Sequence, residues 1–158
     1  MSVQVELSRI YIREMSDIQI IELTELEGAR RFPIVIGLPE AFAIERRLKG
    51  IDIARPQTHD LLSSILTTLG GRFERIEIND LQSGTFFAAL VIIHDGQEIR
   101  IDSRPSDAIA LGVANNVPIF VSEHVIEEAS ADDSLLGTMD DEGVGDPFVE
   151  NDDFETGE

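Results

Sequence analysis

The chain has 158 residues, with 12 Lys and Arg against 31 Asp and Glu, a net charge of −19, and no cysteine. The lack of cysteine excludes disulfides, thiolate metal sites and cysteine nucleophiles, and the length fits one domain with or without a tail. Such an acidic chain is not expected to bind nucleic acid non-specifically, because that binding needs Lys and Arg to replace the counterions of the phosphates.

Alternation of apolar and polar residues indicates the strands, beginning with residues 3–13. A nearly continuous apolar run over residues 85–94 predicts a central strand covered on both faces. Gln82-Ser83-Gly84 and Asp95-Gly96 predict hairpin turns on either side of it. In chain order we predict seven strands, over residues 3–13, 18–25, 32–36, 72–80, 85–94, 98–102 and 118–121.

Four segments have the spacing and the end signals of helices, over residues 39–50, 58–69, 105–116 and 123–129. In the first we expect Phe42 and Ile44 to face the core, and Arg46 and Arg47 to face solvent. In the second, five apolar side chains follow the i, i+3, i+4 pattern and predict a core-facing stripe.

Strands and helices come in runs rather than in strict alternation. This order predicts an α+β domain over residues 1–129, with a mixed, largely antiparallel sheet and about four helices. Residues 130–158 carry 11 acidic and no basic side chains, and we expect an acidic, disordered tail. Such a tail would either stay solvated, or bind a basic partner or the chain's own basic residues. Six of those lie within residues 30–55: Arg30, Arg31, Arg46, Arg47, Lys49 and Arg55.

No apolar run approaches the roughly 18 residues that a membrane span needs. The first residues also lack the basic region followed by an apolar one that marks a secretory signal. We therefore expect a cytoplasmic protein without membrane contact.

Two segments resemble each other: Arg55-Pro56-Gln57-Thr58-His59-Asp60 and Arg104-Pro105-Ser106-Asp107. Each places Arg-Pro before a hydroxyl residue, an Asp and an apolar helical run. Pro, Ser/Thr and Asp are typical of the first turn of a helix, where they cap free N–H groups. A guanidinium beside a helix N-terminus is equally suited to bind a phosphate. Both interpretations stay open at this point, as does binding of a small anion or nucleotide.

The candidate metal ligands are the carboxylates of Asp60, Asp102, Asp107 and Glu40, because Mg²⁺ prefers one or two carboxylates together with substrate phosphate oxygens. This hypothesis requires that the two segments meet in space. A further set would take part in catalysis. Arg55 and Arg104 would stabilise the charge on phosphorus, and His59 would transfer protons. Helix capping is the alternative for Glu40 and both helix-start Asp residues.

Five runs in order resemble the bifunctional nuclease domain family: Ile36–Ala41, Arg55–Leu62, Gly84-Thr85-Phe86, Ile101–Leu111 and Val117–Val121. Together they span most of residues 3–129, and Asp102–Ile109 is the most distinctive of them. The resemblance implies a compact α+β domain, a homodimer, and nuclease activity on DNA and RNA. The site residues above come from the chemistry of the motifs and not from the resemblance.

From these observations we expect a nuclease that hydrolyses phosphodiester bonds of DNA and RNA with Mg²⁺ or Mn²⁺. The alternative is a non-enzymatic interaction or regulatory module, in which the Arg-Pro motifs cap helices or form subunit contacts.

Overall fold

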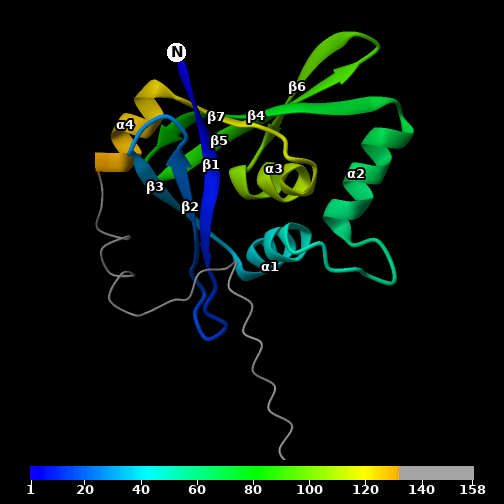
Figure 1. The fold of residues 1–158 in the computed structure, drawn as a ribbon, viewed down its shortest axis with the longest axis horizontal. Coiled ribbons are helices and arrows are strands. Elements are labelled where there is room, and N and C mark those ends of the chain that lie inside the picture. The colour runs from blue at the N-terminus through cyan, green and yellow to red at the C-terminus, as the bar shows by residue number, and fades with distance from the viewer. Residues whose placement is uncertain (132–158) are drawn as a thin grey trace, which may run out of the picture.

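The structure is a computed structural model and describes residues 1–131. One seven-stranded sheet has the order β3-β2-β1-β7-β4-β5-β6 (Figure 1). Neighbouring strands are antiparallel, except for the parallel pair β4 and β7. The strands are β1 Ser2–Tyr11, β2 Gln19–Glu25, β3 Arg31–Ile36, β4 Gly71–Gln82, β5 Thr85–His94, β6 Gln97–Ser103 and β7 Ile119–Ser122. The predicted α+β class with a mixed, largely antiparallel sheet is confirmed.

Two tight hairpins build the half of the sheet that carries the site. Ser83 and Gly84 have φ of 49° and 79°, and Asp95 and Gly96 have φ of 49° and 72°. Two successive residues with positive φ make the turn whose twist matches that of the flanking strands. Both turns were predicted, and they fix the order β4-β5-β6. Within β5 the side chains from Ala88 to Ile92 are buried, as expected of a central strand.

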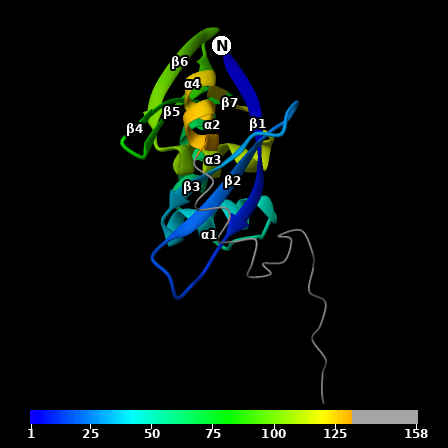
Figure 2. The same cartoon turned by 90° about the vertical axis from the view of Figure 1, so that its left-hand side faces the viewer.

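The four helices are α1 Leu38–Leu48, α2 Thr58–Thr68, α3 Pro105–Gly112 and α4 Glu123–Ala131. All residues of α3 except Asp107 are buried. Figure 1 shows α3 lying between the sheet and α1, with α2 to one side of it, while α4 lies beside β3. Figure 2 shows the same layers from the side. The first turns of α1 and α2 lie close to the first turn of α3.

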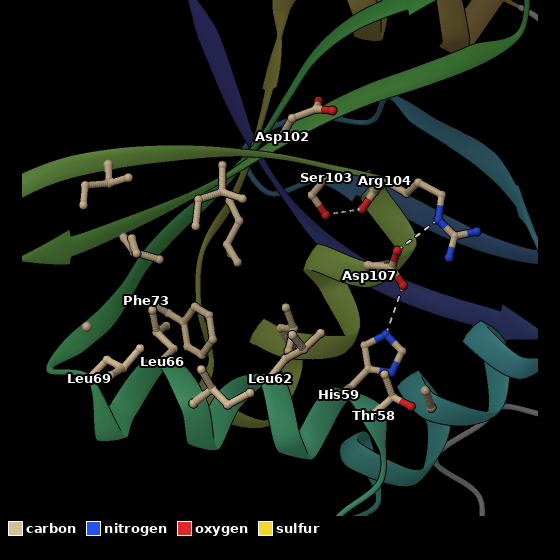
Figure 3. Close-up of a pocket in the computed structure, with 18 of the residues that line it drawn as sticks. Thr58, His59, Leu62, Leu66, Leu69, Phe73, Asp102, Ser103, Arg104 and Asp107 are labelled. Carbon is tan, nitrogen blue, oxygen red and sulfur yellow. Dashed lines mark hydrogen bonds and ion pairs between the residues drawn. The ribbon is translucent and has the colours of Figure 1, made fainter.

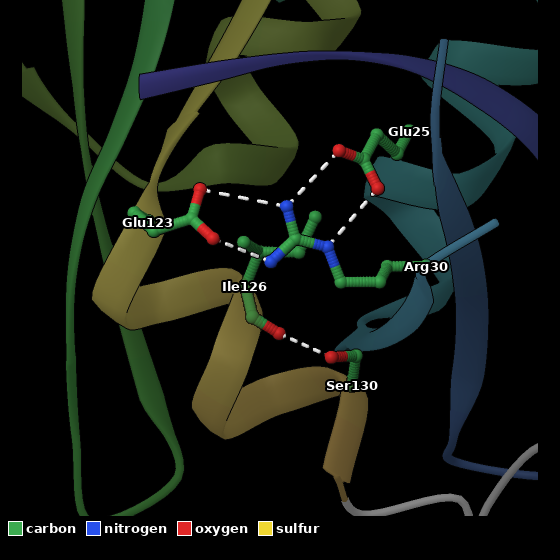
Figure 4. A network of polar contacts seen from close by, with 5 residues as sticks. All are labelled: Glu25, Arg30, Glu123, Ile126 and Ser130. Carbon is green, nitrogen blue, oxygen red and sulfur yellow. Dashed lines mark hydrogen bonds and ion pairs between the residues drawn. The ribbon is translucent and has the colours of Figure 1, made fainter. Parts of the chain in front are cut away.

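A polar network connects the β2–β3 turn to the start of α4 (Figure 4). The Arg30 guanidinium lies 3.0 Å from Glu25 and 2.6 Å from Glu123. The Ser130 hydroxyl donates to the carbonyl of Ile126 in the last turn of α4. Arg30 is thus occupied by structural ion pairs rather than presented to a ligand.

Two expectations about side-chain burial were wrong. Helix α2 forms where predicted, but none of its residues is buried, and Leu61 and Leu69 are 52% and 69% exposed. Phe42 is 42% exposed, whereas the side chains of Arg46 and Arg47 are only 15% and 9% exposed. The arginines are enclosed because they share a carboxylate partner, and helical periodicity cannot reveal such a partner.

The predicted boundary at residue 130 falls inside α4, which includes Ser130 and Ala131. The rest of the predicted tail lies outside the described residues. Within residues 1–131 no helix is long and apolar enough to cross a membrane.

Candidate functional site

A groove of about 1060 Å³ opens between α2, α3 and strands β4 to β6 (Figure 3). One end is lined by Glu40, His59, Arg104 and Asp107, and we call it the polar end. The other, which we call the apolar end, is lined by Leu62, Ile65, Leu69, Ile99 and Ile101. The groove has the size of a ligand site.

Asp107 is the centre of the polar end. One carboxylate oxygen lies 3.0 Å from His59 Nε2, and the other accepts a hydrogen bond of 2.9 Å from Arg104 Nε. Arg104 Nη2 donates at 3.0 Å to Glu40 Oε1. Three helix starts thus contribute to one chain of contacts: Glu40 from α1, His59 from α2, and Arg104 with Asp107 from α3.

The backbone explains why these side chains meet. Asp107 is the third residue of α3 and Glu40 is the third residue of α1, where a carboxylate is favoured by the helix dipole. Gly37, just before α1, leaves room for the Glu40 carboxylate, because a side chain at Gly37 would collide with it. Glu40 can therefore fold back over its own helix start and reach Arg104.

Burial alone would raise the pKa of Asp107, but hydrogen bonds from His59 and Arg104 outweigh it and hold the pKa below its ordinary value. Asp107 is therefore a stable anion near neutral pH. The hydrogen bond to Asp107 raises the pKa of Arg104. The Asp107 carboxylate also orients the imidazole of His59 through the contact at Nε2.

Asp60 points elsewhere. Its carboxylate lies 2.8 Å from Arg46 Nη2 and 2.5 Å from Arg47 Nη1, and it accepts a hydrogen bond of 3.0 Å from the backbone N–H of Gln57. Burial opposes its ionisation, but these donors outweigh it and lower its pKa. Asp60 does not line the groove. It caps α2 and connects it to α1.

Asp102 and Arg55 are separate from the Asp107 cluster. Asp102 lies on β6 at the groove, and its carboxylate points away from Asp107 in Figure 3. Arg55 is exposed and does not line the groove. Neither side chain has a hydrogen bond or an ion pair within residues 1–131. Of the seven predicted residues, the structure brings together Glu40, His59, Arg104 and Asp107.

The four proposed metal ligands do not fit a shared metal centre. Within the described residues no three His, Asp or Glu side chains gather in a way that could hold a metal ion. Asp60 is bound by two guanidinium groups, and Glu40 and Asp107 by a third. Of the four, only Asp102 has no cationic partner within residues 1–131. The dependence on Mg²⁺ or Mn²⁺ stays a prediction of the sequence.

The basic residues between 30 and 55 do not form an open patch either. Arg30, Arg31, Arg46, Arg47 and Lys49 each lie within ion-pair distance of an acidic side chain. Sequence reasoning also missed the apolar wall of the groove, because the apolar stripe of α2 was assigned to the core and no face was assigned to Ile99 and Ile101. The structure shows the reason: strand β6 and helix α2 carry large apolar side chains that stay exposed within residues 1–131.

Comparison with known proteins agrees with this motif pattern. Residues 21–134 match the family described as the bifunctional nuclease domain. An uncharacterised protein of Mycobacterium tuberculosis (strain H37Rv) is 36% identical over 126 residues, which cover 80% of this chain and 75% of that protein. Proteins named Bifunctional nuclease 2 from rice and Arabidopsis thaliana are 26% and 23% identical. Their alignments cover 77% and 78% of this chain but 43% of each plant protein. The chain belongs to the bifunctional nuclease domain family.

Proposed function

We propose that this chain hydrolyses phosphodiester bonds of DNA and RNA at the polar end of the groove. The observation that carries the proposal is the contact chain His59–Asp107–Arg104, in which an imidazole and a guanidinium share one carboxylate at the edge of a large cavity. The names of the plant relatives support the same class of reaction.

In the proposed reaction Arg104 binds the scissile phosphate. Its side chain is 64% exposed, and Nη1 has no partner within residues 1–131. Because Nε and Nη2 are held by Asp107 and Glu40, the guanidinium is fixed before substrate arrives. A fixed cationic donor stabilises the negative charge that develops on the phosphate oxygens.

His59 is the group that transfers the proton. Its Nε2 faces Asp107, and Nδ1 has no hydrogen bond within the described part of the chain. Nδ1 is therefore the atom that takes a proton from attacking water or gives one to the leaving oxygen. Asp107 keeps the ring in one orientation and stabilises the imidazolium that forms.

The charge of the protein limits how it binds its substrate. A net charge of −19 repels nucleic acid over long distances, so binding relies on short-range contacts at the groove. We expect the protein to bind nucleic acid weakly. The affinity should be higher for single strands, which are thin enough to enter the groove, than for duplexes.

The test is cleavage of labelled DNA and RNA by highly purified protein, with Arg104→Ala and Arg72→Ala compared. Arg104→Ala is expected to lower the cleavage rate about a hundredfold, since a donor to the developing charge is lost. Arg72, an exposed arginine of β4 paired with Glu74, is the matched control and should leave the rate unchanged.

Equal rates in the wild type and Arg104→Ala would assign the activity to a contaminant or to another site. A parallel series with EDTA, Mg²⁺ and Mn²⁺ measures the metal dependence separately. Full activity in EDTA would contradict the predicted dependence on Mg²⁺ or Mn²⁺ but would not contradict the role of Arg104.

We also propose that a second copy of this chain covers the apolar end of the groove. Leu62 and Ile65 on α2 are both 46% exposed, and Leu69, just after α2, is 69% exposed. Ile99 and Ile101 on β6 are 40% and 43% exposed. An exposed apolar area of this kind marks an interaction site. Strand β6 is the edge of the sheet, so its free backbone groups are available for pairing.

The charges of β6 favour a second copy as the partner. Antiparallel pairing of two β6 strands centred on Ile101 places Arg100 of each copy opposite Asp102 of the other, an arrangement that stabilises a strand pair. Asp102 has no partner within residues 1–131, and this pairing supplies one. The contact is self-complementary, as a two-fold dimer requires.

Light scattering during gel filtration tests this interface. The wild type should be a dimer, and Ile65→Asp should be a monomer because a charge is placed in the apolar contact. Ile18→Asp is the control, because Ile18 is also exposed, at 54% against 46% for Ile65, but lies in the loop before β2. A monomeric wild type, or an Ile65→Asp variant that stays dimeric, would rule this surface out.

A further inference from the structure

A second pocket, of about 660 Å³, lies on the other side of Arg104. It is bounded by β3, the β4–β5 hairpin, the start of α3 and the end of α4. Its walls include Val35, Thr85, Phe86, Ser106 and Glu128, together with Arg104, which also lines the groove. The nuclease proposal makes no use of this pocket.

Ser106 is a buried polar residue in this pocket without a partner. The residue is 5% exposed, and its hydroxyl makes no hydrogen bond within residues 1–131. The hydroxyl oxygen is nevertheless not fully enclosed. The small exposed surface of Ser106 therefore includes this oxygen. A buried hydroxyl is normally hydrogen-bonded, and here the bond is available to a ligand in the pocket.

The N-terminus of α3 meets the pocket at the same place. No side chain caps this helix, and the Asp107 carboxylate is turned toward Arg104 and His59 instead. The N–H of Ala108 bonds to the carbonyl of Arg104, whereas the N–H groups of Ser106 and Asp107 precede that bond. Within residues 1–131 these two amides and the Ser106 hydroxyl have no hydrogen bond. Unbonded donors at the positive end of a helix favour an anion with several oxygens.

The remaining walls have a different character. Pro33, Val35 and Phe86 give apolar surface, and Asp17 and Glu128 contribute carboxylates. Carboxylates repel a second phosphate but accept hydrogen bonds from the N–H groups at the edge of a nucleobase. The pocket thus suits a molecule with a single phosphate and a planar base, and its volume lies within the range of small-molecule sites.

We propose that this pocket binds a nucleoside monophosphate, with its phosphate at Ser106 and the first amides of α3. The base lies against Phe86 and Val35, with its N–H groups toward Asp17 and Glu128. This binding does not depend on cleavage. A nucleoside monophosphate is the kind of molecule that hydrolysis of nucleic acid releases.

Calorimetric titration of the full chain with adenosine monophosphate, inorganic phosphate and adenosine tests the proposal. Adenosine monophosphate should bind more tightly than either of the other two. Ser106→Ala should weaken its binding about tenfold, as expected for one hydrogen bond to a charged group. Thr58→Ala, which removes a hydroxyl from the first turn of α2, is the matched control and should bind as the wild type does.

Absence of heat at millimolar adenosine monophosphate would overturn the proposal, as would unchanged affinity in Ser106→Ala. Binding of phosphate alone, with no gain from the nucleoside, would contradict the nucleotide assignment. Amide resonances of the wild type give a readout that does not depend on any variant folding. The N–H signals of Ser106 and Asp107 should shift with adenosine monophosphate, and unshifted signals would place any binding elsewhere.

Discussion

Replacing His59 with glutamine is expected to lower the rate of phosphodiester cleavage about a thousandfold, the range of a lost general acid or base. Glutamine keeps a polar side chain of similar length that still reaches Asp107, so the start of α2 stays in place. Wild-type cleavage should also depend on pH through the imidazole, and that limb of the pH profile should vanish in the variant. A purely structural His59 would change the rate without changing the shape of the profile.

The control for His59→Gln is His94→Gln. His94 lines the same groove at its other end, where Nε2 contacts the carbonyl oxygen of Leu69 at 3.1 Å. Its replacement should leave the cleavage rate within a few-fold of the wild type. Equal losses in both variants would show that the imidazole at the polar end has no special role, and wild-type cleavage by His59→Gln would exclude it from the reaction.

Periodicity and turn chemistry were enough to predict the strands and hairpins of the sheet, but not the place of β7 between β1 and β4. Strand patterns and the turns at Ser83-Gly84 and Asp95-Gly96 depend on local rules, and local rules act in the same way in any fold. The burial of α2 depends instead on what lies opposite it. Its apolar stripe predicted a core-facing side, but within residues 1–131 only Leu66 of the stripe packs against the core, and it is half-buried.

The two Arg-Pro segments show how far a motif can mislead. Asp60 and Asp107 are both the third residue of a helix. Pro105, however, is the first residue of α3, whereas Pro56 lies outside α2, which begins at Thr58. Arg104 is therefore at the cap of its helix and reaches Asp107, whereas Arg55 lies further out and reaches neither Asp. A displacement of two residues separates a site residue from a solvated one.

Three of the four carboxylates chosen as metal ligands share a simpler property. Glu40, Asp60 and Asp107 all lie third in their helices, a position favoured by the dipole and by capping. Which of them serves chemistry is decided by tertiary partners. Asp107 contacts an imidazole of another helix, and Asp60 forms ion pairs with two arginines. Those partners are 13 to 48 residues away in the chain, beyond the reach of any local pattern.

Replacing Asp60 with asparagine is expected to lower the free energy of unfolding by about 3 kcal/mol, because two largely enclosed guanidinium groups lose the anion that they share. Asparagine can still accept the hydrogen bond from the N–H of Gln57, so the change isolates the charge. Arg47 also donates to the carbonyl of Leu111 at 3.3 Å, so Asp60 connects α2, through Arg47, to the end of α3. The midpoint of thermal unfolding should fall by about 10 °C.

Helix α2 should respond most, since it has no buried side chain and depends on Asp60 and His59 for its attachment. Its amides should exchange hydrogen faster in Asp60→Asn than in the wild type. The pH dependence has a fixed sign. The pKa of Asp60 is lowered in the folded state, so its stabilisation is complete above the ordinary value of 3.8 and disappears as the pH falls through the folded value. The wild type and Asp60→Asn should therefore converge in stability in acid.

Asp102→Asn separates this structural role from metal binding. Asp102 is exposed and has no partner within residues 1–131, so its replacement should leave the unfolding midpoint of the monomeric Ile65→Asp background unchanged. A metal centre shared by Asp60 and Asp102 predicts another outcome: Mg²⁺ would raise the midpoint of the wild type, and either replacement would abolish that rise. Asp60→Asn could instead be as stable as the wild type, with both variants losing the Mg²⁺-dependent rise of the unfolding midpoint. That result would show that Asp60 binds a metal rather than stabilising the fold through the two arginines.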